Sequence, residues 1–133
     1  NTTPSDLSKL KDVVSPEEIL DAQNVIQDIY VDEKVEDYVL KLIFATRDPQ
    51  DHGLNDLEGI IDFGASPRAT INLVRAAKAR AFTERRGYIT PEDIRYVGAD
   101  VLRHRVILTY EAEAEELVAD DIIQRLFEVI EVP

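Results

Sequence analysis

An all-α fold is predicted for this chain of 133 residues: a small bundle of four long helices with short helical or extended pieces between them. Two observations predict it. Apolar residues recur every three or four positions over several long segments, and this spacing collects them on one face of a helix. Three segments also open with a hydroxyl residue followed by proline, at 15–16, 66–67 and 90–91. Serine and threonine favour the helix cap, and proline favours the first helical position.

Residues 1–14 are expected to form a linker, and the segment after them the first helix. Ser15 and Glu18 have the spacing of a capping box, in which each side chain accepts a backbone N–H of the other residue. The helix should run from Pro16 to about Tyr30 because apolar residues follow the cap at helical spacing. These residues are Ile19, Ala22, Ile26 and Ile29.

A second helix is predicted between Asp32, which can cap it, and Arg47. It should end there because Asp48 precedes Pro49, and the residue before a proline disfavours the helical region. Its apolar stripe is Val35, Tyr38, Val39, Leu42 and Ile43. Residues 49–63 contain Gly, Asn and Asp, which are typical of turns and interrupt regular structure. We expect a loop here, in which one short helical turn is allowed.

The stretch from Gly64 to Arg86 contains the central helix of the prediction. Ser66 is expected to be its N-cap and Pro67 its first residue, and strong helix formers follow. Gly87 is expected to end it at the C′ position, where glycine is common. One side carries Leu73, Val74, Ala77 and Ala81, and the other carries Arg68 and Arg75.

The last third of the chain should hold two more helices. Thr90 is expected to cap the first, whose inward residues are Ile94, Val97, Val101 and Leu102. Residues 106–110 are apolar and β-branched, which fits a short strand or extended segment. The acidic residues 111–116 are typical of a solvated loop. The final helix should begin at Ala119, with Ile122, Ile123, Leu126, Phe127 and Ile130 facing the core.

Charge is distributed unevenly along the chain. The net charge is −12, yet residues 66–105 carry 9 basic against 4 acidic side chains. Residues 1–65 carry 5 basic and 15 acidic side chains, and residues 106–133 carry 1 and 8. A basic middle between acidic segments indicates a local anion or partner site. The acidic flanks would repel a duplex, so nucleic acid binding is not expected.

Several classes of protein are excluded or disfavoured by composition. No cysteine is present, which excludes disulfides and thiolate chemistry. No stretch approaches the roughly 20 apolar residues that cross a bilayer, so no membrane span is expected. The two histidines, His52 and His104, belong to no Glu-x-x-His or His-x-x-x-His pair, and no metal site is expected. His104 fits a hydrogen bond at a helix end better than a contact with nucleotide.

The motifs of a complete ATPase are missing. G-x-x-x-x-G-K-[ST] occurs nowhere, so nothing cradles the α and β phosphates. No hydrophobic strand ending in paired acids is present to hold Mg²⁺. The chain is therefore expected to be inactive as an ATPase when alone. Its start on Asn1, without methionine, suggests a piece of a longer protein.

Four segments, in order, carry a family resemblance: GASPRA, GYITPEDI, VLRHRVIL and TYEAEAE, from Gly64 to about Glu115. Together with the weaker match VVSPEEILDAQ from Val13, they make the chain resemble the C-terminal helical lid domain of MoxR-type AAA+ ATPases. The resemblance implies that residues 15–133 are a lid domain of AAA+ type and residues 1–14 a linker from a P-loop core. It also implies a cytoplasmic, chaperone-like whole that uses ATP to remodel client proteins.

Further partners follow from the same resemblance. Members of the family commonly assemble into a homo-oligomeric ring, a hexamer, and are often associated with proteins that bear a von Willebrand factor A domain. The lid would contact its own P-loop core, and nucleotide would bind between the two. The implied cofactor is ATP, with Mg²⁺ supplied by the core.

The resemblance assigns the catalytic role of sensor 2, which reaches the nucleotide phosphates from the lid, to Arg68. Arginine suits this role because its charge is fixed and its planar fork offers several donors to phosphate oxygens. Ser66 and Pro67 should orient it at a helix start whose free N–H groups and dipole also favour an anion. Ile71, one turn along, could abut the adenine, with ordinary packing as the alternative. Ser66, Pro67, Arg68 and Ile71 are therefore the expected nucleotide-binding residues.

Other interpretations stay open beside this one. A free-standing acidic helical adaptor could bind another protein through its acidic face, although an adaptor has no reason to keep an arginine directly after Ser-Pro at a helix start. A helix-turn-helix regulator would need a basic surface outside the middle stretch. Arg103 and Arg105 could pair with acidic residues within the lid or across a subunit boundary.

Overall fold

The computed structural model describes residues 10–133 and confirms the all-α prediction. Its helices are α2 (Pro16–Gln27), α3 (Glu33–Arg47), α4 (Ala69–Thr83), α5 (Pro91–Leu102), α6 (Tyr110–Ala114) and α7 (Ala119–Val129). Two short 3₁₀ turns, Pro49–His52 and Asn55–Leu57, follow α3, and two short strands, β1 (Ile61–Phe63) and β2 (Ile107–Leu108), pair with each other.

The predicted caps Ser15, Asp32 and Thr90 account for three of the six helix starts within residues 10–133, whereas Ser66 does not cap α4, whose N-cap position is Arg68. The Ser15 hydroxyl accepts the Glu18 N–H at 3.2 Å, and the Glu18 carboxylate accepts the Ser15 N–H at 3.3 Å. The Asp32 carboxylate caps α3 by accepting the Lys34 N–H at 2.8 Å. Thr90 makes the same reciprocal pair with Asp93 at the start of α5. Each such cap satisfies a backbone donor that the first helical turn leaves unpaired.

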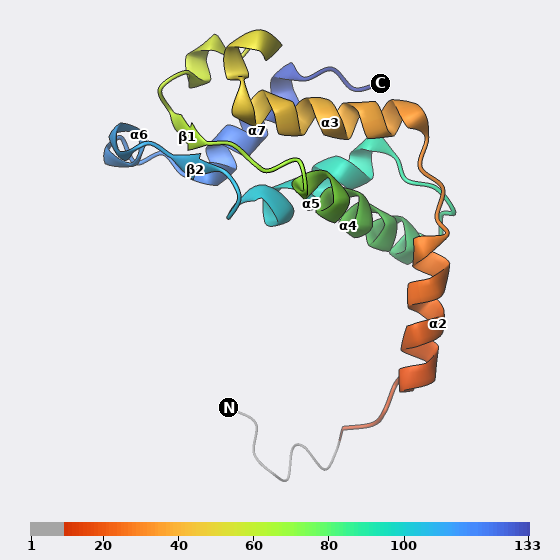
Figure 1. Ribbon diagram of the computed structural model, residues 1–133. Helices are drawn as coiled ribbons and strands as arrows, with labels where there is room; N and C mark the ends of the chain where they lie inside the picture. Colours follow the sequence, from red (N-terminus) through yellow and green to blue (C-terminus); the bar gives the residue numbers. More distant parts are fainter. Residues whose placement is uncertain (1–9) are drawn as a thin grey trace.

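The core lies between α3, α4, α5 and α7, as Figure 1 shows. The closest pair is α4 with α5, and α3 and α7 pack on this pair and on each other. All the predicted stripe residues of α3 are buried, and so are Leu73, Ala77 and Ala81 of α4 and Ile122, Ile123 and Leu126 of α7. Small side chains on α4 allow the close approach of α5. Gly98 of α5 meets Phe127 of α7, and a β carbon there would lie 2.3 Å from the ring.

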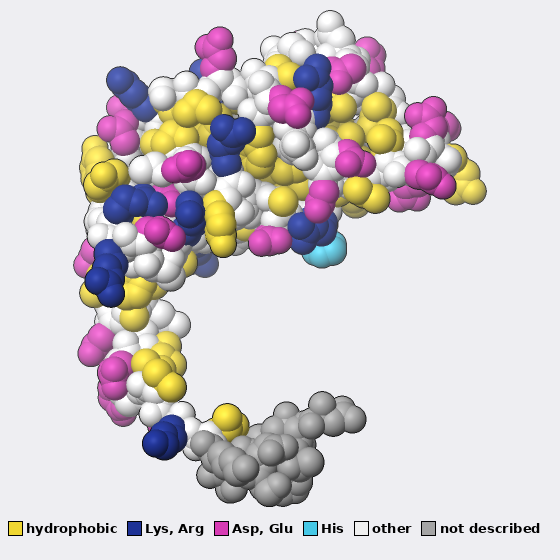
Figure 2. All heavy atoms as spheres, turned by 180° about the vertical axis from the view of Figure 1, so that it is seen from behind, with side chains coloured by type: hydrophobic (Ala, Val, Ile, Leu, Met, Phe, Trp, Pro, Cys, Tyr) yellow, Lys and Arg dark blue, Asp and Glu magenta, His cyan; other side chains and the backbone are white. Residues whose placement is uncertain are grey.

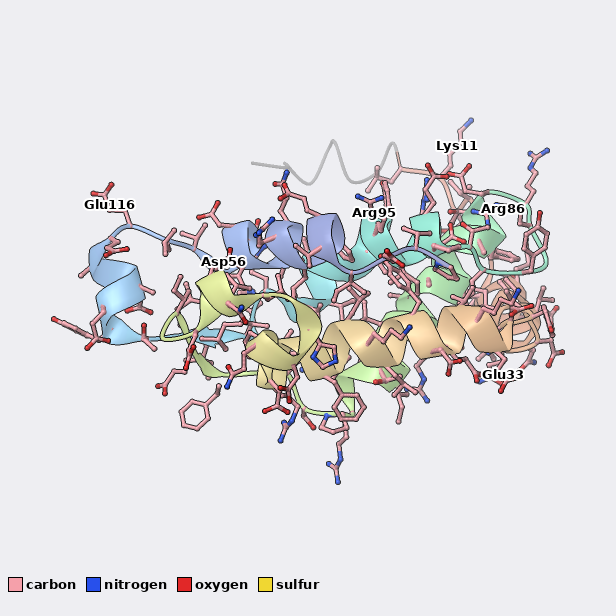
Figure 3. The ribbon with its side chains drawn as sticks, turned by 90° about the horizontal axis from the view of Figure 1, so that it is seen from above. Lys11, Glu33, Asp56, Arg86, Arg95 and Glu116 are labelled. Carbon is pink, nitrogen blue, oxygen red and sulfur yellow. The ribbon has the colours of Figure 1, made fainter. Side chains whose placement is uncertain are left out.

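The small sheet extends from one end of the bundle. Ile61 pairs with Leu108 and Phe63 with Ile107 in antiparallel register. The extended segment predicted at 106–110 is confirmed at Ile107–Leu108, although Tyr110 already belongs to α6. The loop predicted at 49–63 contains two 3₁₀ turns where one short helical turn was allowed, and it is wrong at 61–63, which form β1. The solvated loop predicted at 111–116 is also wrong, because Thr109 accepts the Ala112 N–H at 3.2 Å and caps α6. Figure 3 shows Glu116, just after α6, at the opposite end of the molecule from Arg86.

Helix α2 extends away from the rest of the structure (Figure 1), and none of its residues is buried. It ends at Gln27, three residues before the predicted end, because the chain then turns to pair Tyr30 with Tyr88 in an isolated bridge. Figure 2 shows hydrophobic side chains gathered along one side of α2 and acidic side chains along the other. Residues 1–9 of the predicted linker lie outside the described part, and its apolar Leu10, Val13 and Val14 are exposed.

Both predicted ends of the central helix differ from the structure. Regular α-helix begins at Ala69 rather than Pro67, because the preceding turn is closed by shorter, i to i+3 hydrogen bonds. At the other end Gly87 is not the C′ residue. Arg85 takes the left-handed conformation there, with φ of 59°. The Arg85 N–H bonds to the Phe82 carbonyl at 3.0 Å and the Arg86 N–H to the Ala81 carbonyl at 2.9 Å, the two bonds of a Schellman motif.

Candidate functional site

The Ser-Pro-Arg turn, residues 64–68, leads from β1 to the N-terminus of α4. Ser66, Pro67 and Arg68 are all exposed, and Arg68 directly precedes the first residue of the helix. Leu73 and Ala77, on the opposite side of α4, are buried. Among the described residues no ion pair involves Arg68. Its guanidinium is thus directed outward and available to an external group.

The backbone N–H groups of residues 68–71 are all hydrogen-bonded, which corrects part of one expectation. The Ser66 hydroxyl accepts the Arg68 N–H at 3.3 Å, and the Ser66 carbonyl accepts the Ala69 N–H at 2.8 Å. The N–H groups of Thr70 and Ile71 bond to the carbonyls of Pro67 and Arg68, each at 3.1 Å. The N–H groups from Arg68 to Ile71 are therefore not free for an anion, whereas the Ser66 N–H forms no hydrogen bond within residues 10–133. Attraction for an anion rests on the guanidinium of Arg68 and the helix dipole.

The turn is fixed to the last residues of α3. The Ala65 N–H donates to the Thr46 hydroxyl at 2.9 Å, and the Arg47 guanidinium donates to the Ala65 carbonyl at 3.3 Å. Gly64 lies so close to α3 that an added β carbon would be 2.4 Å from the Thr46 carbonyl oxygen. Glycine is required at this position because no side chain fits the close approach of the two backbones.

Ile71 lies one turn beyond Arg68 and is 58% exposed. It borders a groove of about 360 Å³ between α3 and α4, which we call the α3–α4 groove. Leu40, Ile71 and Val74 supply its apolar wall, and Glu36, Thr70, Arg75 and Lys78 supply its polar side chains. Ordinary core packing does not account for Ile71, since a core side chain would be buried. An apolar surface with a cationic rim can accept a flat ring beside an anion.

Part of the basic middle segment has a structural role that the sequence did not indicate. Asp93 is 0% exposed and receives hydrogen bonds from Arg86 at 2.7 and 2.5 Å, from Arg80 at 3.3 Å and from the Thr90 N–H at 2.8 Å. The Arg80 guanidinium also stacks on Tyr96, 4.0 Å from the ring centre. These contacts join the end of α4 to the start of α5. Two of the arginines predicted to belong to a basic site thus neutralise a buried carboxylate.

The pKa of Asp93 reflects two opposing effects. Burial raises the pKa of a carboxyl group, whereas the hydrogen bonds from Arg86 and from the Thr90 N–H lower it. Burial is the largest single effect, but these hydrogen bonds and the charge of Arg86 together outweigh it, so the pKa of Asp93 lies below its ordinary value. Asp93 is therefore ionised at neutral pH despite its burial.

Arg103 pairs with acidic residues of the same chain, which was one of the two possibilities expected for it. It contacts Asp120 at 2.7 Å and Asp100 at 3.1 Å, and so links α5 to α7. Arg105 forms no ion pair, and His104 no hydrogen bond, with any residue between 10 and 133.

Within residues 10–133, no three His, Cys, Asp or Glu side chains are arranged to hold a metal ion. None of the described helices is long and apolar enough to cross a membrane.

Comparison with known proteins matches residues 57–126 to the family described as AAA lid domain. The chaperone MoxR1 of Mycobacterium tuberculosis is 37% identical over 123 residues, which are 92% of this chain and 33% of that protein. Protein MoxR of Paracoccus denitrificans is 43% identical over 103 residues, 72% of this chain and 30% of that protein. This chain thus spans about a third of the length of the curated relatives that it matches.

A solved structure is similar over nearly the whole chain. The crystal structure of a candidate ATPase from Cytophaga hutchinsonii superimposes with a TM-score of 0.89 at 40% sequence identity. The match covers 96% of this chain and 40% of that one. Sequence and fold therefore point to the same kind of protein.

Proposed function

The chain belongs to the AAA lid domain family, in its MoxR-type form, and from this premise we propose that it acts as a sensor 2 lid. In this role it binds ATP together with a P-loop core and couples hydrolysis to remodelling of client proteins. The core supplies the P-loop and the Mg²⁺, which this chain has no motif to hold. The lid supplies one cation and one wall of the nucleotide site.

One observation carries the proposal. Arg68 is exposed at the N-terminus of a 15-residue helix, on a turn held to α3 through Ala65 and closed by the hydrogen bonds of Ser66. A fixed cation on a rigid support is what stabilises charge that develops on a transferring phosphoryl group. The Ser-Pro-Arg turn and the neighbouring α3–α4 groove together would contact the phosphates and the adenine, the latter through Ile71.

The remaining parts of the proposal follow from the family. The complete protein would be cytoplasmic and would assemble into a homo-oligomeric ring, with a hexamer as the expected form. A protein with a von Willebrand factor A domain would be a partner. In such a ring, the change of angle between core and lid on hydrolysis would be passed to the client. Residues 1–14 would be the linker to the core, and residues 15–133 the lid.

Replacement of Arg68 by alanine in the full-length ATPase tests this function. We expect ATP hydrolysis to fall at least about 10-fold, since a charged contact with the transferring group is typically worth more than the roughly 1.4 kcal/mol this requires. Stability should change by less than about 0.5 kcal/mol, as is usual for exposed side chains. Arg68→Lys should restore little activity because a point charge does not reproduce the arginine fork.

Arg95→Ala provides a matched control, because Arg95 is an exposed arginine on α5. It should hydrolyse ATP at the normal rate. Assembly of each variant is checked by size-exclusion chromatography with light scattering. Near-normal hydrolysis by an assembled Arg68→Ala protein would refute the sensor role and favour an acidic adaptor that binds another protein.

A further inference from the structure

The polar backbone groups of Ala65 are both held by the last two residues of α3. The Ala65 N–H donates to the Thr46 hydroxyl at 2.9 Å, and its carbonyl accepts from the Arg47 guanidinium at 3.3 Å. Thr46 is 1% exposed, and Ala65 is buried as well. The turn that carries Arg68 thus begins on a dry, hydrogen-bonded contact with another helix rather than as a free loop.

The hydroxyl of Thr46 has a fixed orientation. It donates its hydrogen to the Ile43 carbonyl at 2.6 Å, one turn back along α3. With the hydrogen engaged there, a lone pair of the oxygen is directed to the Ala65 N–H. Valine has the shape of threonine but can neither donate nor accept. Serine keeps both hydrogen bonds.

The path from Thr46 to Arg68 is short and rigid. Gly64 lies against the carbonyl of Thr46 with no space for a side chain, so the turn cannot move closer to α3. After Ala65, the Ser66 hydroxyl holds the Arg68 N–H and the Ser66 carbonyl holds the Ala69 N–H. A shift of Ala65 would therefore carry the backbone of Arg68 with it.

We propose that Thr46 is a positioning residue for Arg68: its hydroxyl seats the Ser-Pro-Arg turn on α3 and sets where the guanidinium meets the phosphates. The proposal rests on the proposed function of Arg68. Thr46 itself is buried and contacts no nucleotide. A displacement of about 1 Å in a catalytic group can lower a rate up to about 100-fold. The hydrogen bond from the Ala65 N–H to Thr46 should therefore affect the rate of hydrolysis more than the binding of ATP.

The experiment compares Thr46→Val with Thr46→Ser in the full-length ATPase. For Thr46→Val we expect kcat to fall about 5-fold or more, but no further than in Arg68→Ala, with KM for ATP changed less than about 2-fold. Thr46→Ser should keep kcat within about 2-fold of the wild type, because the hydroxyl remains. Amide exchange of the segment 64–68, followed by mass spectrometry, should become faster in the valine variant and not in the serine variant.

A double variant separates positioning from general damage. If Thr46 acts through Arg68, then adding Thr46→Val to Arg68→Ala should lower kcat no further. Thr90→Val is the matched control, because it also removes a hydroxyl that both donates and accepts a hydrogen bond. Both bonds are with Asp93, near the C-terminal end of α4. It should lower thermal stability without a specific loss of kcat at 25 °C.

Arg47→Ala provides a second variant in case Thr46→Val does not fold. Arg47 is exposed, so its truncation leaves the core intact while it removes the bond to the Ala65 carbonyl. A smaller fall in kcat is expected, again absent in the Arg68→Ala background. A further fall in that background would instead mean that Arg47 contacts the nucleotide itself.

The outcomes distinguish this inference from the proposed function. Normal hydrolysis by Arg68→Ala would overturn the proposed function and this inference with it. Impaired Arg68→Ala with normal Thr46→Val and Arg47→Ala would overturn the positioning role alone. The positioning role would also be overturned if kcat fell equally in Thr46→Val and Thr46→Ser. The same holds if Thr46→Val lowered kcat further in the Arg68→Ala background.

Discussion

Asp93 is the residue on which the contact between α4 and α5 depends. Its carboxylate is inaccessible to solvent and is surrounded by Arg80, Arg86 and the N–H of Thr90. A buried charge of this kind is tolerated only when its hydrogen-bonding capacity is used. Loss of the charge would leave Arg86 without its counterion and Arg80 with only Glu84, at 3.7 Å.

Asp93→Asn should therefore destabilise the lid by about 2–4 kcal/mol at neutral pH. The pKa of Asp93 is lowered in the folded state, so its contribution is present above the unfolded pKa of about 4 and is lost as the pH falls below it. The difference in unfolding free energy between the wild type and the variant should thus shrink below about pH 4. Urea unfolding at several pH values measures it.

Asp100→Asn is the control for this measurement, since Asp100 pairs with Arg103 but its side chain is 78% exposed. It should change stability by less than about 0.5 kcal/mol. Two results would contradict the role given to the buried charge. One is an Asp93→Asn protein that loses no more stability than Asp100→Asn, and the other is a stability difference between wild type and Asp93→Asn that grows as the pH falls.

Sequence patterns identify some site residues and miss others for a physical reason. The exposed positions of Arg68 and Ile71 agree with helical spacing, which puts both on the side of the helix away from Leu73 and Ala77. The sequence places Thr46 only within the second predicted helix and Asp93 only at the start of the helix that Thr90 caps. Their partners lie 19 positions away in one case and 7 to 13 in the other, so only the fold brings them together.

At the scale of elements, local signals predict the helices well and the pieces between them poorly. The caps at Ser15, Asp32 and Thr90 are confirmed because each needs only residues within three positions. β1 could not be predicted in this way, since its two ladder partners come from β2, more than 40 positions later. The short helix α6 depends on Thr109, whose hydroxyl also donates to the Gly59 carbonyl at 2.8 Å.

The C-terminus of α4 offers a test of one such boundary. Arg85 has φ of 59°, a conformation that costs a non-glycine residue roughly 1–2 kcal/mol. Arg85→Gly should relieve this strain and, after the greater entropy of glycine in the unfolded chain, stabilise the lid by up to about 1 kcal/mol. Gly87→Ala should change stability by less than about 0.5 kcal/mol, because a β carbon there meets no atom within 4 Å.

Chemical denaturation of the two variants decides between the two positions. The sequence alone favours Gly87 as the residue that ends the helix. If that were so, Gly87→Ala would destabilise the lid and Arg85→Gly would not stabilise it. A destabilised Gly87→Ala protein together with an unchanged or weakened Arg85→Gly protein would mean that the helix ends as the sequence suggests.

At the scale of the whole molecule, the basic middle of the chain divides into two kinds of residue. Arg80, Arg86 and Arg103 pair with aspartates and hold the helices together. Arg68 and Arg75 are exposed, and Arg75 borders the α3–α4 groove that Ile71 also lines. The charge pattern of the sequence predicts a basic segment as a site for an anion or partner, but it cannot say which arginines remain available to a ligand. Only the available ones can contribute to nucleotide binding.

The isolated chain of 133 residues should fold, be mainly helical and bind ATP only in the millimolar range or more weakly. Folding is expected because α3, α4, α5 and α7 bury one another in a continuous core. Weak binding is expected because one arginine and a helix end supply about 2–4 kcal/mol, whereas millimolar affinity already needs about 4 kcal/mol. We expect a binding energy nearer about 2 than about 4 kcal/mol. The N–H groups of residues 68–71 are already hydrogen-bonded, and they cannot bind phosphate without breaking these bonds. Circular dichroism and calorimetry with ATP measure the two properties, and the Arg68→Ala chain provides the control for the residual binding. Hydrolysis should be absent, because neither a P-loop nor a site for Mg²⁺ is present in this sequence. A spectrum dominated by strand, micromolar affinity or turnover of ATP by the purified chain would each contradict a lid that works only together with a core.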